Sequence, residues 1–355
     1  MTVYFIWKGD KIYMKRRICL LLIITLCMTL FASYRANASE MLSMLHTDGN
    51  KIVNAYGTQI TLRGTNLGGW LMQEGWMTPL GAGEIDHSFI TKITTSVSNE
   101  GHIPEYAIDT ITNNGIVINN MSTYWQSPTA QEKNSAEILI ELDKTRCFDR
   151  IVIETGPDHT SDYLRGAVVW MSNNWKDWFS ADNITVDESK VSEGIITIKT
   201  GEQFAKYIAL RPGRASENGQ VWTVANISLC MTDEYTVRNH LIRRFGETRT
   251  NEMIAAFQNS YITESDIQNI ANMNMNLIRV PVYWMDFALH DGTLRTDPNS
   301  GFAKLDWLLE VCRKKGIYVL IDFHGAPGGV NCWASCGQAG TIPTELYAGN
   351  PSMVA

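Results

Sequence analysis

The chain has 355 residues, of which 45% are hydrophobic and 19% charged, a balance typical of folded globular proteins rather than of disordered ones. Its formal net charge of −7 argues against nucleic acid as a binding partner. The seven cysteines show no paired C-x-x-C spacing, so we expect no cysteine-based zinc site.

The first 38 residues have the pattern of a secretory signal. Three basic residues, Lys15–Arg17, precede an apolar run over 18–31, and Ala36–Ala38 forms a small-residue cleavage site. We therefore expect a secreted, extracellular protein that is cleaved near Ala38. A membrane anchor is the alternative, but a membrane-spanning helix needs about 20 apolar residues and this run has about 14, so we expect no membrane span after cleavage. Cleavage removes six basic residues and one acidic residue, which changes the net charge from −7 to −12.

Export would place the five remaining cysteines in an oxidising compartment. Cys332 and Cys336 are close enough in the sequence to close a small disulfide loop, and the odd number leaves one cysteine free. Cys312 lies in a helical apolar pattern, so we expect it to be a small buried hydrophobic residue.

Residues 39–83 are expected to form a hairpin followed by a buried strand. Turn residues occur at Asp48–Asn50 and at Tyr56–Gly57, and the apolar residues Ile60 and Leu62 precede a glycine-rich end.

Residues 84–232 have a different sequence pattern, in which short alternating runs of apolar residues are separated by polar turns. The runs include Ile138, Ile140 and Leu142; Ile151 and Ile153; Val168 and Trp170; Ile196 and Ile198; Ile208 and Leu210; and Ile227 and Leu229. This spacing predicts an antiparallel β-sandwich.

In residues 233–355 the apolar period becomes helical. A capping-box pattern at Thr263 begins a helix whose apolar residues lie three to four apart. A near-continuous apolar strand follows over 277–284, then a helix over 304–315 and a second buried strand over 318–323. Strand, helix and strand in this order, with both strand faces apolar, predict a parallel sheet.

Polar residues come directly after the predicted strands, where a parallel barrel places its active site. Taken singly, each has a structural explanation. Arg279 could satisfy a structural carboxylate, His324 could pack beside nearby glycines, and Glu74 could be a solvated loop acid.

Three strings, taken together, are more specific. The chain contains, in this order, LRGTNLGGW at 62–70, TESDIQNIANMNMNLIRVPVYW at 263–284 and IDFHGAPGGVN at 321–331. They resemble glycoside hydrolase family 5, and most of all its exo-β-1,3-glucanase branch, which follows a Gly-Gly-Trp start with Glu-x-Trp, here Glu74–Trp76. The resemblance covers about 46–82 and 233–355. It implies an α/β fold, a partial TIM (β/α)8 barrel interrupted by the antiparallel sandwich.

The family resemblance implies a role for each matched residue. Arg279 matches the arginine that holds the nucleophilic glutamate as a charged carboxylate, through two parallel hydrogen bonds that lower the pKa of that acid. His324 matches the histidine that hydrogen-bonds a sugar hydroxyl where the bond breaks. Glu74 matches the acid that binds hydroxyls at the non-reducing end, and Asn331 matches a pocket residue more loosely. Packing rather than sugar stacking is expected of Trp70, Trp76 and Trp284.

The family mechanism is retaining and needs two carboxyl groups about 5 to 5.5 Å apart, one as nucleophile and one as acid/base. Family enzymes supply the acid from an asparagine-glutamate pair after the fourth strand and the nucleophile after the seventh. No such pair follows His324, and Glu345 is not expected to replace it. We therefore expect residues 233–355 to continue a barrel that is truncated after its third strand, and the polypeptide to be catalytically incomplete. The family implies no cofactor.

Residues 84–232 resemble a factor 5/8 type C, or discoidin-like, domain, a jelly-roll sandwich that includes many carbohydrate-binding modules. The resemblance rests on 107–109, 122–127, 137–142, 148–152, 207–211 and 227–231. Relatives often bind glycans through loop aromatics, for which Trp175, Trp178 and Phe179 are candidates here; the alternative is a spacer that packs on the barrel. Some relatives hold a structural calcium near the position of Asp109, but the sequence does not show its oxygen ligands.

Two hypotheses about function follow from these resemblances. In the first, the full-length protein is an extracellular hydrolase whose partner is a β-glucan; β-1,3 linkages are favoured, and cellulose-type and β-1,6-linked substrates stay open. In the second, the barrel is degenerate and the protein is a non-catalytic glycan-binding protein that uses the sandwich.

Overall fold

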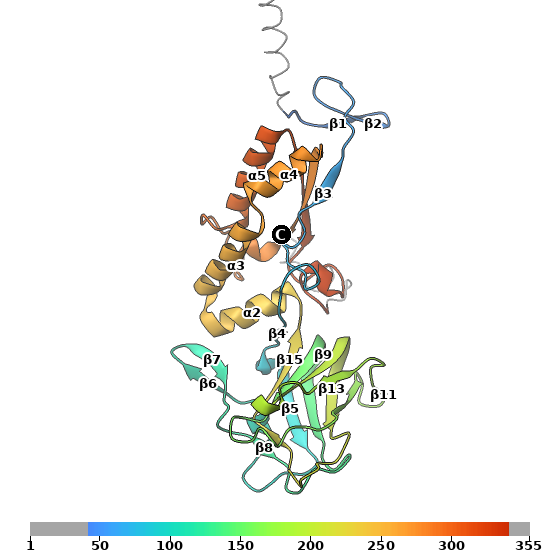
Figure 1. The fold of residues 1–355 in the computed structure, drawn as a ribbon, viewed down its shortest axis with the longest axis vertical. Helices are drawn as coiled ribbons and strands as arrows, with labels where there is room; N and C mark the ends of the chain where they lie inside the picture. Colours follow the sequence, from blue (N-terminus) through green and yellow to red (C-terminus); the bar gives the residue numbers. More distant parts are fainter. Residues whose placement is uncertain (1–41, 341–355) are drawn as a thin grey trace, which may run out of the picture. The chain divides into compact units, whose positions relative to one another are not determined.

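A computed structural model describes residues 42–340, and Figure 1 shows their ribbon coloured along the chain. The expected signal segment and Glu345 lie outside the described residues. The chain divides into two compact units. Of the described residues, one unit comprises 42–65, 264–278 and 308–319, and the other comprises 66–263, 279–307 and 320–340.

The first unit contains a short hairpin and a helix: β1 (His46–Asp48), β2 (Lys51–Val53) and α4 (Glu264–Asn272). The predicted turn at Asp48–Asn50 joins the two hairpin strands. Asn276 fixes the chain around it, because its side chain accepts from the Arg63 amide at 2.8 Å and donates to the Thr61 carbonyl at 3.0 Å. Its own carbonyl accepts from the Tyr318 amide at 2.8 Å.

A three-stranded sheet has the order β17-β16-β3. Its strands are β3 (Gly64–Asn66), β16 (Leu277–Tyr283) and β17 (Tyr318–Gly325), and α5 (Gly301–Lys315) joins β16 to β17. The predicted order of strand, helix and strand is therefore present. A parallel bridge between Leu71 and Val282 extends the contact beyond β3.

Two expectations about these strands are wrong. The strand that follows the hairpin, β3, was expected to be buried, but its three residues are exposed or half-buried. The expected burial of the last strand fails at Leu320, Ile321 and Phe323, which are 51%, 48% and 57% exposed. The physical reason is that β17 forms an edge of the sheet, and within residues 42–340 no further strand pairs with it.

The second unit contains the predicted antiparallel sandwich. The main sheet has the order β11-β10-β13-β9-β15-β4, with β12 paired to β13 and β5 paired to β9. Its strands are β4 (Gly83–Glu84), β5 (Ile90–Thr95), β9 (Ile138–Glu154), β10 (Val168–Ser172), β11 (Trp178–Phe179), β12 (Thr185–Asp187), β13 (Ile195–Arg211) and β15 (Asn226–Met231). Two further antiparallel pairs are β6 (Thr110–Asn113) with β7 (Ile116–Asn119), and β8 (Trp125–Gln126) with β14 (Thr223–Val224).

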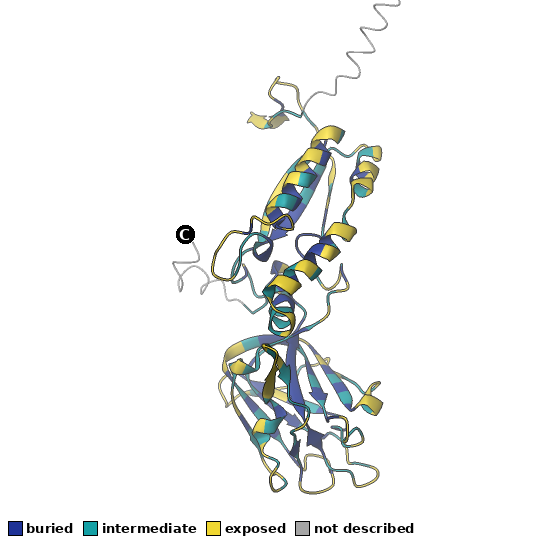
Figure 2. Ribbon diagram, turned by 90° about the vertical axis from the view of Figure 1, so that its left-hand side faces the viewer, coloured by how far each residue is buried: buried dark blue, intermediate teal, exposed yellow. Residues whose placement is uncertain are grey.

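The sandwich has its own hydrophobic core, seen as dark blue residues inside it in Figure 2. Ile138, Ile140 and Leu142 are fully buried because alternate side chains of β9 point to the same face. Trp125 and Trp222 meet edge to face with ring centroids 5.0 Å apart. Each large apolar side chain buried in this way stabilises the fold by roughly 1.5 to 3 kcal/mol.

Helices α2 (Glu234–Phe245) and α3 (Glu247–Tyr261) follow the last sandwich strand. Asp233 caps α2 by accepting a hydrogen bond from the Thr236 amide at 2.6 Å, and Gly246, with a φ of 78°, follows its end. Short 3-10 helices span His87–Phe89, Pro104–Ala107, Val191–Glu193, Trp284–Asp286 and Ala334–Cys336. Within the described range, no helix has the length and apolar character needed to cross a membrane.

Candidate functional site

Three polar side chains meet on two neighbouring strands of the small sheet. Asp322 and His324 lie on the same face of β17 because they are two residues apart, and Arg279 lies on β16. Nη2 of Arg279 contacts Oδ2 of Asp322 and lies 3.3 Å from Nδ1 of His324. The Nδ1 atom of His324 is 2.9 Å from the same Asp322 oxygen. We call Arg279, Asp322 and His324 the strand-end cluster after His324, the last residue but one of β17; the expectation that Arg279 ends its strand is wrong, because it is the third residue of β16.

The strand-end cluster is open to ligands and has a defined polarity. The side chains of Arg279, Asp322 and His324 are 35%, 29% and 38% exposed. Because Nδ1 of His324 faces a carboxylate oxygen, we assign the hydrogen of the neutral ring to Nδ1, which leaves Nε2 as an acceptor. Nη1 of Arg279 has a longer contact, 3.4 Å to the amide oxygen of Asn66 at the end of β3.

Glu74 lies in a loop that is fixed independently of the strand-end cluster. Its carboxylate accepts from the indole nitrogen of Trp76 at 2.8 Å, and its carbonyl accepts from the Met77 amide at 2.9 Å. The preceding amide, of Gln73, donates to the Glu234 carboxylate at 2.8 Å. Within residues 42–340, no hydrogen bond or ion pair joins Glu74 to Arg279 or His324.

Asn331 likewise makes a hydrogen bond within its own loop, in which its side-chain oxygen accepts from the Trp333 amide at 2.8 Å. Trp70 packs as predicted, 1% exposed, with its indole nitrogen 2.9 Å from the Gln258 carbonyl. Trp284 is partly buried against the ring of His290. The packing expected of Trp76 is wrong, because its side chain is 79% exposed and contacts Glu74.

Sequence reasoning missed a buried ionic cluster that joins α2 to the residues after β16. Arg238 pairs with Glu234 and lies 2.9 Å from Asp286, and all three side chains are at most 2% exposed. Gln258 donates to Asp286 at 3.0 Å. Burial raises the pKa of Glu234 to about 7, although Arg238 opposes the shift. The spacing of four residues between Glu234 and Arg238 at a helix start is the signal that could have pointed to this pair.

Asp233, the N-cap of α2, and Tyr235 in its first turn hold the loop that follows His324. Asp233 accepts from the Ala339 amide at 2.8 Å, and the Tyr235 amide donates to the Gly337 carbonyl at 2.8 Å. The buried ring of Tyr283 packs on the same loop, where a Cβ added at Gly337 would come within 2.6 Å of it. Burial raises the pKa of Asp233 to about 6.

The described cysteines are all free thiols, so the structure contains no disulfide between Cys332 and Cys336. The Cys336 thiol instead donates to nearby carbonyls, including that of Trp333 at 3.1 Å. Cys312 is buried as predicted. Burial raises the pKa of the Cys230 thiol to about 12, which keeps that sulfur protonated.

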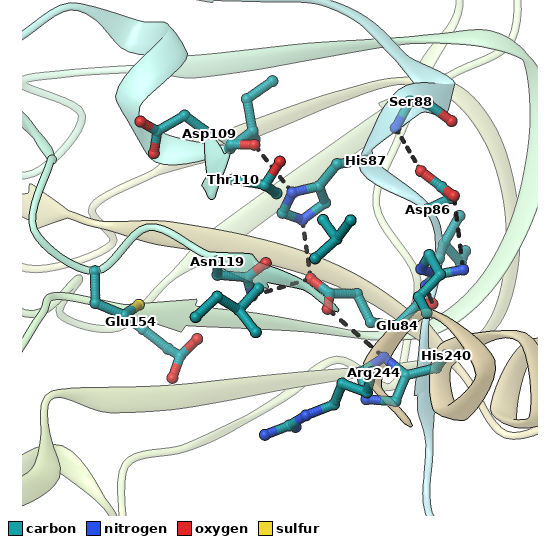
Figure 3. Close-up of a pocket in the computed structure, with 16 residues that line it drawn as sticks. Glu84, Asp86, His87, Ser88, Asp109, Thr110, Asn119, Glu154, His240 and Arg244 are labelled. Carbon is teal, nitrogen blue, oxygen red and sulfur yellow. Dashed lines mark hydrogen bonds and ion pairs between the residues drawn. The ribbon is translucent and has the colours of Figure 1, made fainter. Parts of the chain in front are cut away.

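A polar pocket of about 620 Å³ lies between the β6–β7 hairpin and α2 (Figure 3). Glu84 is at its centre, with an oxygen 2.9 Å from Nε2 of His87 and the other 3.7 Å from Nδ1 of His240. Ser228 and Asn119 donate to the same carboxylate at 2.5 and 3.3 Å. Burial alone would raise the pKa of Glu84, but His87, Ser228 and His240 lower it to about 2. The pocket is therefore built around a carboxylate that is ionised at neutral pH.

The aromatic candidates of the sandwich line a second hollow. Trp175 and Trp178 border a groove of about 430 Å³ on the face formed by β9, β10 and β13. We call it the tryptophan groove. The other residues that line it are Glu137, Leu139, Trp170, Ala209 and Arg211. Phe179 is 38% exposed but does not line the groove. An aromatic groove with a few polar groups is suited to a ligand that has both apolar faces and hydroxyl groups.

The carboxylate of Asp109, near which a calcium ion was considered, accepts hydrogen bonds from protein donors. The Thr123 hydroxyl donates to it at 2.8 Å and the Asn120 amide at 3.0 Å. Among residues 42–340, no group of three or more histidine, cysteine, aspartate or glutamate side chains is placed to hold a metal ion.

Comparison with protein families identifies two segments. Residues 242–345 match the family model of cellulase (glycosyl hydrolase family 5), and residues 91–227 match that of the F5/8 type C domain. The two families are those that the sequence motifs resemble, so both resemblances are confirmed. Together the matched segments include Arg279, Asp322 and His324 in one family and the tryptophan groove in the other.

Several curated proteins are similar to part of the chain. A probable glucan endo-1,6-beta-glucosidase B of Aspergillus flavus is 39% identical over 90 residues, which are 24% of this chain and 22% of that protein. A glucan 1,3-beta-glucosidase of Blumeria graminis is 34% identical over 116 residues, 31% of this chain and 24% of that protein. The chain thus spans about a quarter of the length of these relatives.

Solved structures similar to the chain include a pectin-binding carbohydrate-binding module, with 20% identity and a TM-score of 0.28 over 39% of this chain and 89% of that one. Another is the module CBM32-3 from a family 31 glycoside hydrolase of Clostridium perfringens, with 18% identity and a TM-score of 0.34 over 42% of this chain and 94% of that one.

Proposed function

We propose that this chain, which carries a family 5 glycosyl hydrolase segment and an F5/8 type C domain, belongs to a secreted enzyme that hydrolyses β-glucan with retention of configuration. The observation that supports this most is the strand-end cluster, where Arg279 and His324 meet at one carboxylate, that of Asp322. Polar groups gathered on adjacent strands in this way suit the end of a barrel at which family enzymes bind sugar.

In this proposal Arg279 binds the nucleophilic glutamate of the enzyme. Its Nη2 atom faces Asp322, while Nη1 has a contact of 3.4 Å with Asn66, which is long for a hydrogen bond. Nη1 is therefore available to a second carboxylate. A guanidinium placed there keeps that carboxylate ionised, as a nucleophile must be.

His324 binds the sugar at the point of cleavage. Its Nδ1 hydrogen is directed at Asp322, so Nε2 accepts a hydrogen bond from a sugar hydroxyl. Glu74 and Asn331 bind further hydroxyls of the substrate, and the carboxylate of Glu74 keeps an oxygen that is not engaged by Trp76.

We further propose that residues 1–355 alone hydrolyse no glucan. A retaining mechanism needs two carboxyl groups about 5 to 5.5 Å apart. Within the described residues, the carboxylate in the strand-end cluster is that of Asp322, and it is already paired with Arg279 and His324. In this proposal the acid/base and the nucleophile are not among the described residues.

The substrate is proposed to be a β-1,3-glucan, with β-1,6-glucan as the competing outcome. The Glu74–Trp76 pattern and the HGAPGG string favour the first. The names of the two matched relatives support a β-linked glucan. One is named a 1,3-glucosidase and the other an endo-1,6-glucosidase, so the names do not favour either linkage.

The test is an assay of the complete gene product on laminarin, on a linear β-1,6-glucan and on carboxymethylcellulose. Cleavage of laminarin at the highest kcat/KM is the expected result. Preference for the β-1,6-glucan would correct the linkage, and absence of hydrolysis on all three polymers would overturn the proposal.

A non-catalytic glycan-binding protein is the second candidate function. The tryptophan groove favours it, because Trp175 and Trp178 are available to a sugar without any contribution from the barrel. In that case the complete gene product would bind a polysaccharide and release no sugar from it.

A further inference from the structure

The groove on the sandwich contains a tryptophan in an unusual backbone conformation. Trp175 has a φ of 65°, in the left-handed region that bulky residues rarely adopt. The other non-glycine residues with positive φ in the described part of the chain are Asn114, Asn134 and Asn274. Asparagine adopts this conformation more readily than tryptophan does, so the position holds an indole where glycine would be relaxed. Strain of this kind is typical of functional sites.

The turn that carries Trp175 is rigidly bonded. The side-chain oxygen of Asn174 accepts from the amides of Lys176 and Asp177 at 3.0 and 2.9 Å. The Asn174 amide group also donates to the Asp177 carboxylate at 2.7 Å. The indole nitrogen of Trp178 donates to the Trp175 carbonyl at 3.1 Å, which ties β11 to the turn. The strained conformation is therefore enforced by its neighbours.

The indole of Trp175 has a fixed orientation, and the side chains of Trp175 and Trp170 are open to solvent. The ring of Trp175 meets that of Trp178 edge to face at 5.8 Å and that of Tyr207 at 5.1 Å, so its orientation is fixed on both sides. Trp175 is nevertheless 51% exposed, and Trp170 on β10 is 38% exposed. A rigid, solvent-facing aromatic surface can bind a ligand with little loss of conformational entropy.

The charges of the groove balance. Arg211 on β13 donates from Nε to the Glu137 carboxylate at 2.5 Å, and these are the two charged residues that line the groove. A pair of opposite charges offers hydrogen-bond donors and acceptors but no net field. The groove is thus suited to an uncharged ligand that carries hydroxyl groups.

We propose that Trp170, Trp175 and Trp178 form a stacking platform for successive rings of an uncharged β-linked glucan, whose hydroxyl groups are bound by Arg211 and Glu137. β-linked glucose rings carry their hydroxyls at the edge and expose apolar C–H faces, which stack on indoles. The inference deepens the proposed function, because it rests on the sandwich as a glycan-binding part of a β-glucan hydrolase. It adds Trp170, Arg211 and Glu137 to the site and names its ligand class.

The test compares the purified chain with its Trp175→Gly and Trp170→Ala variants. Affinity for soluble laminarin, a linear β-1,6-glucan and polygalacturonate is measured by affinity electrophoresis, and thermal unfolding is measured on the same samples. We expect each variant to lose affinity at least roughly tenfold, since a stacking surface is removed. Trp175→Gly should also keep or raise the melting temperature, because glycine relaxes the backbone. Asn114→Gly, a left-handed position outside the groove, is the matched control and should keep full affinity.

The outcomes separate this inference from the function on which it rests. Undiminished binding in both tryptophan variants would overturn the platform and leave glycan binding by the chain intact. Stronger binding of polygalacturonate than of neutral glucan would overturn the ligand class. If the unaltered chain binds no glucan, the inference falls, whereas hydrolysis by the complete gene product is decided by its own assay.

Discussion

At the scale of single residues, Asp322 orients the two basic side chains of the candidate site. One of its oxygens faces both Nη2 of Arg279 and Nδ1 of His324, so a single carboxylate fixes a guanidinium and an imidazole. This arrangement depends on the planar fork of arginine, which a lysine cannot reproduce. A positive charge at Arg279 without the guanidinium geometry is therefore not expected to preserve the site.

Replacement of Arg279 by lysine tests this dependence. In the complete gene product, Arg279→Lys should lower kcat on the preferred glucan by roughly 100-fold, because a hydrogen bond to the reacting carboxylate is lost. Arg313→Lys is the control, since Arg313 pairs with Glu310 on the exposed side of α5. Equal kcat for the two variants would remove Arg279 from the mechanism.

Glu84 gives a pH dependence with a defined sign. Its pKa of about 2 lies below the ordinary 4.5, so the ionised side chain stabilises the fold above about pH 4.5, and this stabilisation is lost as the pH falls towards 2. The shift corresponds to about 3 kcal/mol. In urea unfolding, Glu84→Gln should therefore be less stable than the parent at pH 6 by about that amount and approach it near pH 2.

The control for Glu84 is Glu310→Gln, which alters an exposed acid on α5. This change should leave the free energy of unfolding nearly unchanged at both pH values, because exposed ion pairs contribute little. A stability gap between Glu84→Gln and the parent that stays constant from pH 6 to pH 2 would contradict the assignment.

At the scale of elements, the end of β17 is packed directly against the end of β16. A Cβ added at Gly325 would clash with the ring of Tyr283, whose side chain is fully buried. Gly325→Ala should therefore lower the free energy of unfolding by about 1 to 3 kcal/mol through overpacking. It should also displace His324, its neighbour in the strand.

The matched control is Gly81→Ala, because a Cβ at Gly81 would meet no atom within 4 Å. Chemical denaturation of both variants gives the comparison. Stability losses of similar size at the two positions would show that Gly325 is not closely packed.

The elements with a strong periodic pattern were predictable from the sequence. Apolar residues at 277–284 and 318–323 predicted strands that the structure has as Leu277–Tyr283 and Tyr318–Gly325, and the expected helix over 304–315 lies within Gly301–Lys315. The edge position of β17 was not predictable. An apolar pattern indicates that a strand is buried, but it does not show which element covers it. The need for glycine at Gly64 was not predictable either, because it comes from the close approach of Leu277, a residue far away in the sequence.

At the scale of the whole molecule, the features that escaped prediction depend on residues far apart in the sequence. The hydrogen bond from Gln73 to Glu234 joins a residue that precedes the sandwich in the sequence to one that follows it, 161 residues later. The motifs located Arg279 and His324, but only the strand pairing brings Asp322 between them. The left-handed conformation of Trp175 likewise follows from a turn geometry that composition does not reveal.

The central claim is that the strand-end cluster belongs to a retaining hydrolase of β-glucan. The most direct measurement is proton NMR of the sugar first released from laminarin by the complete gene product, before mutarotation. The account predicts the β-anomer, because attack by a carboxylate and then by water inverts the anomeric carbon twice. Initial release of the α-anomer would contradict it.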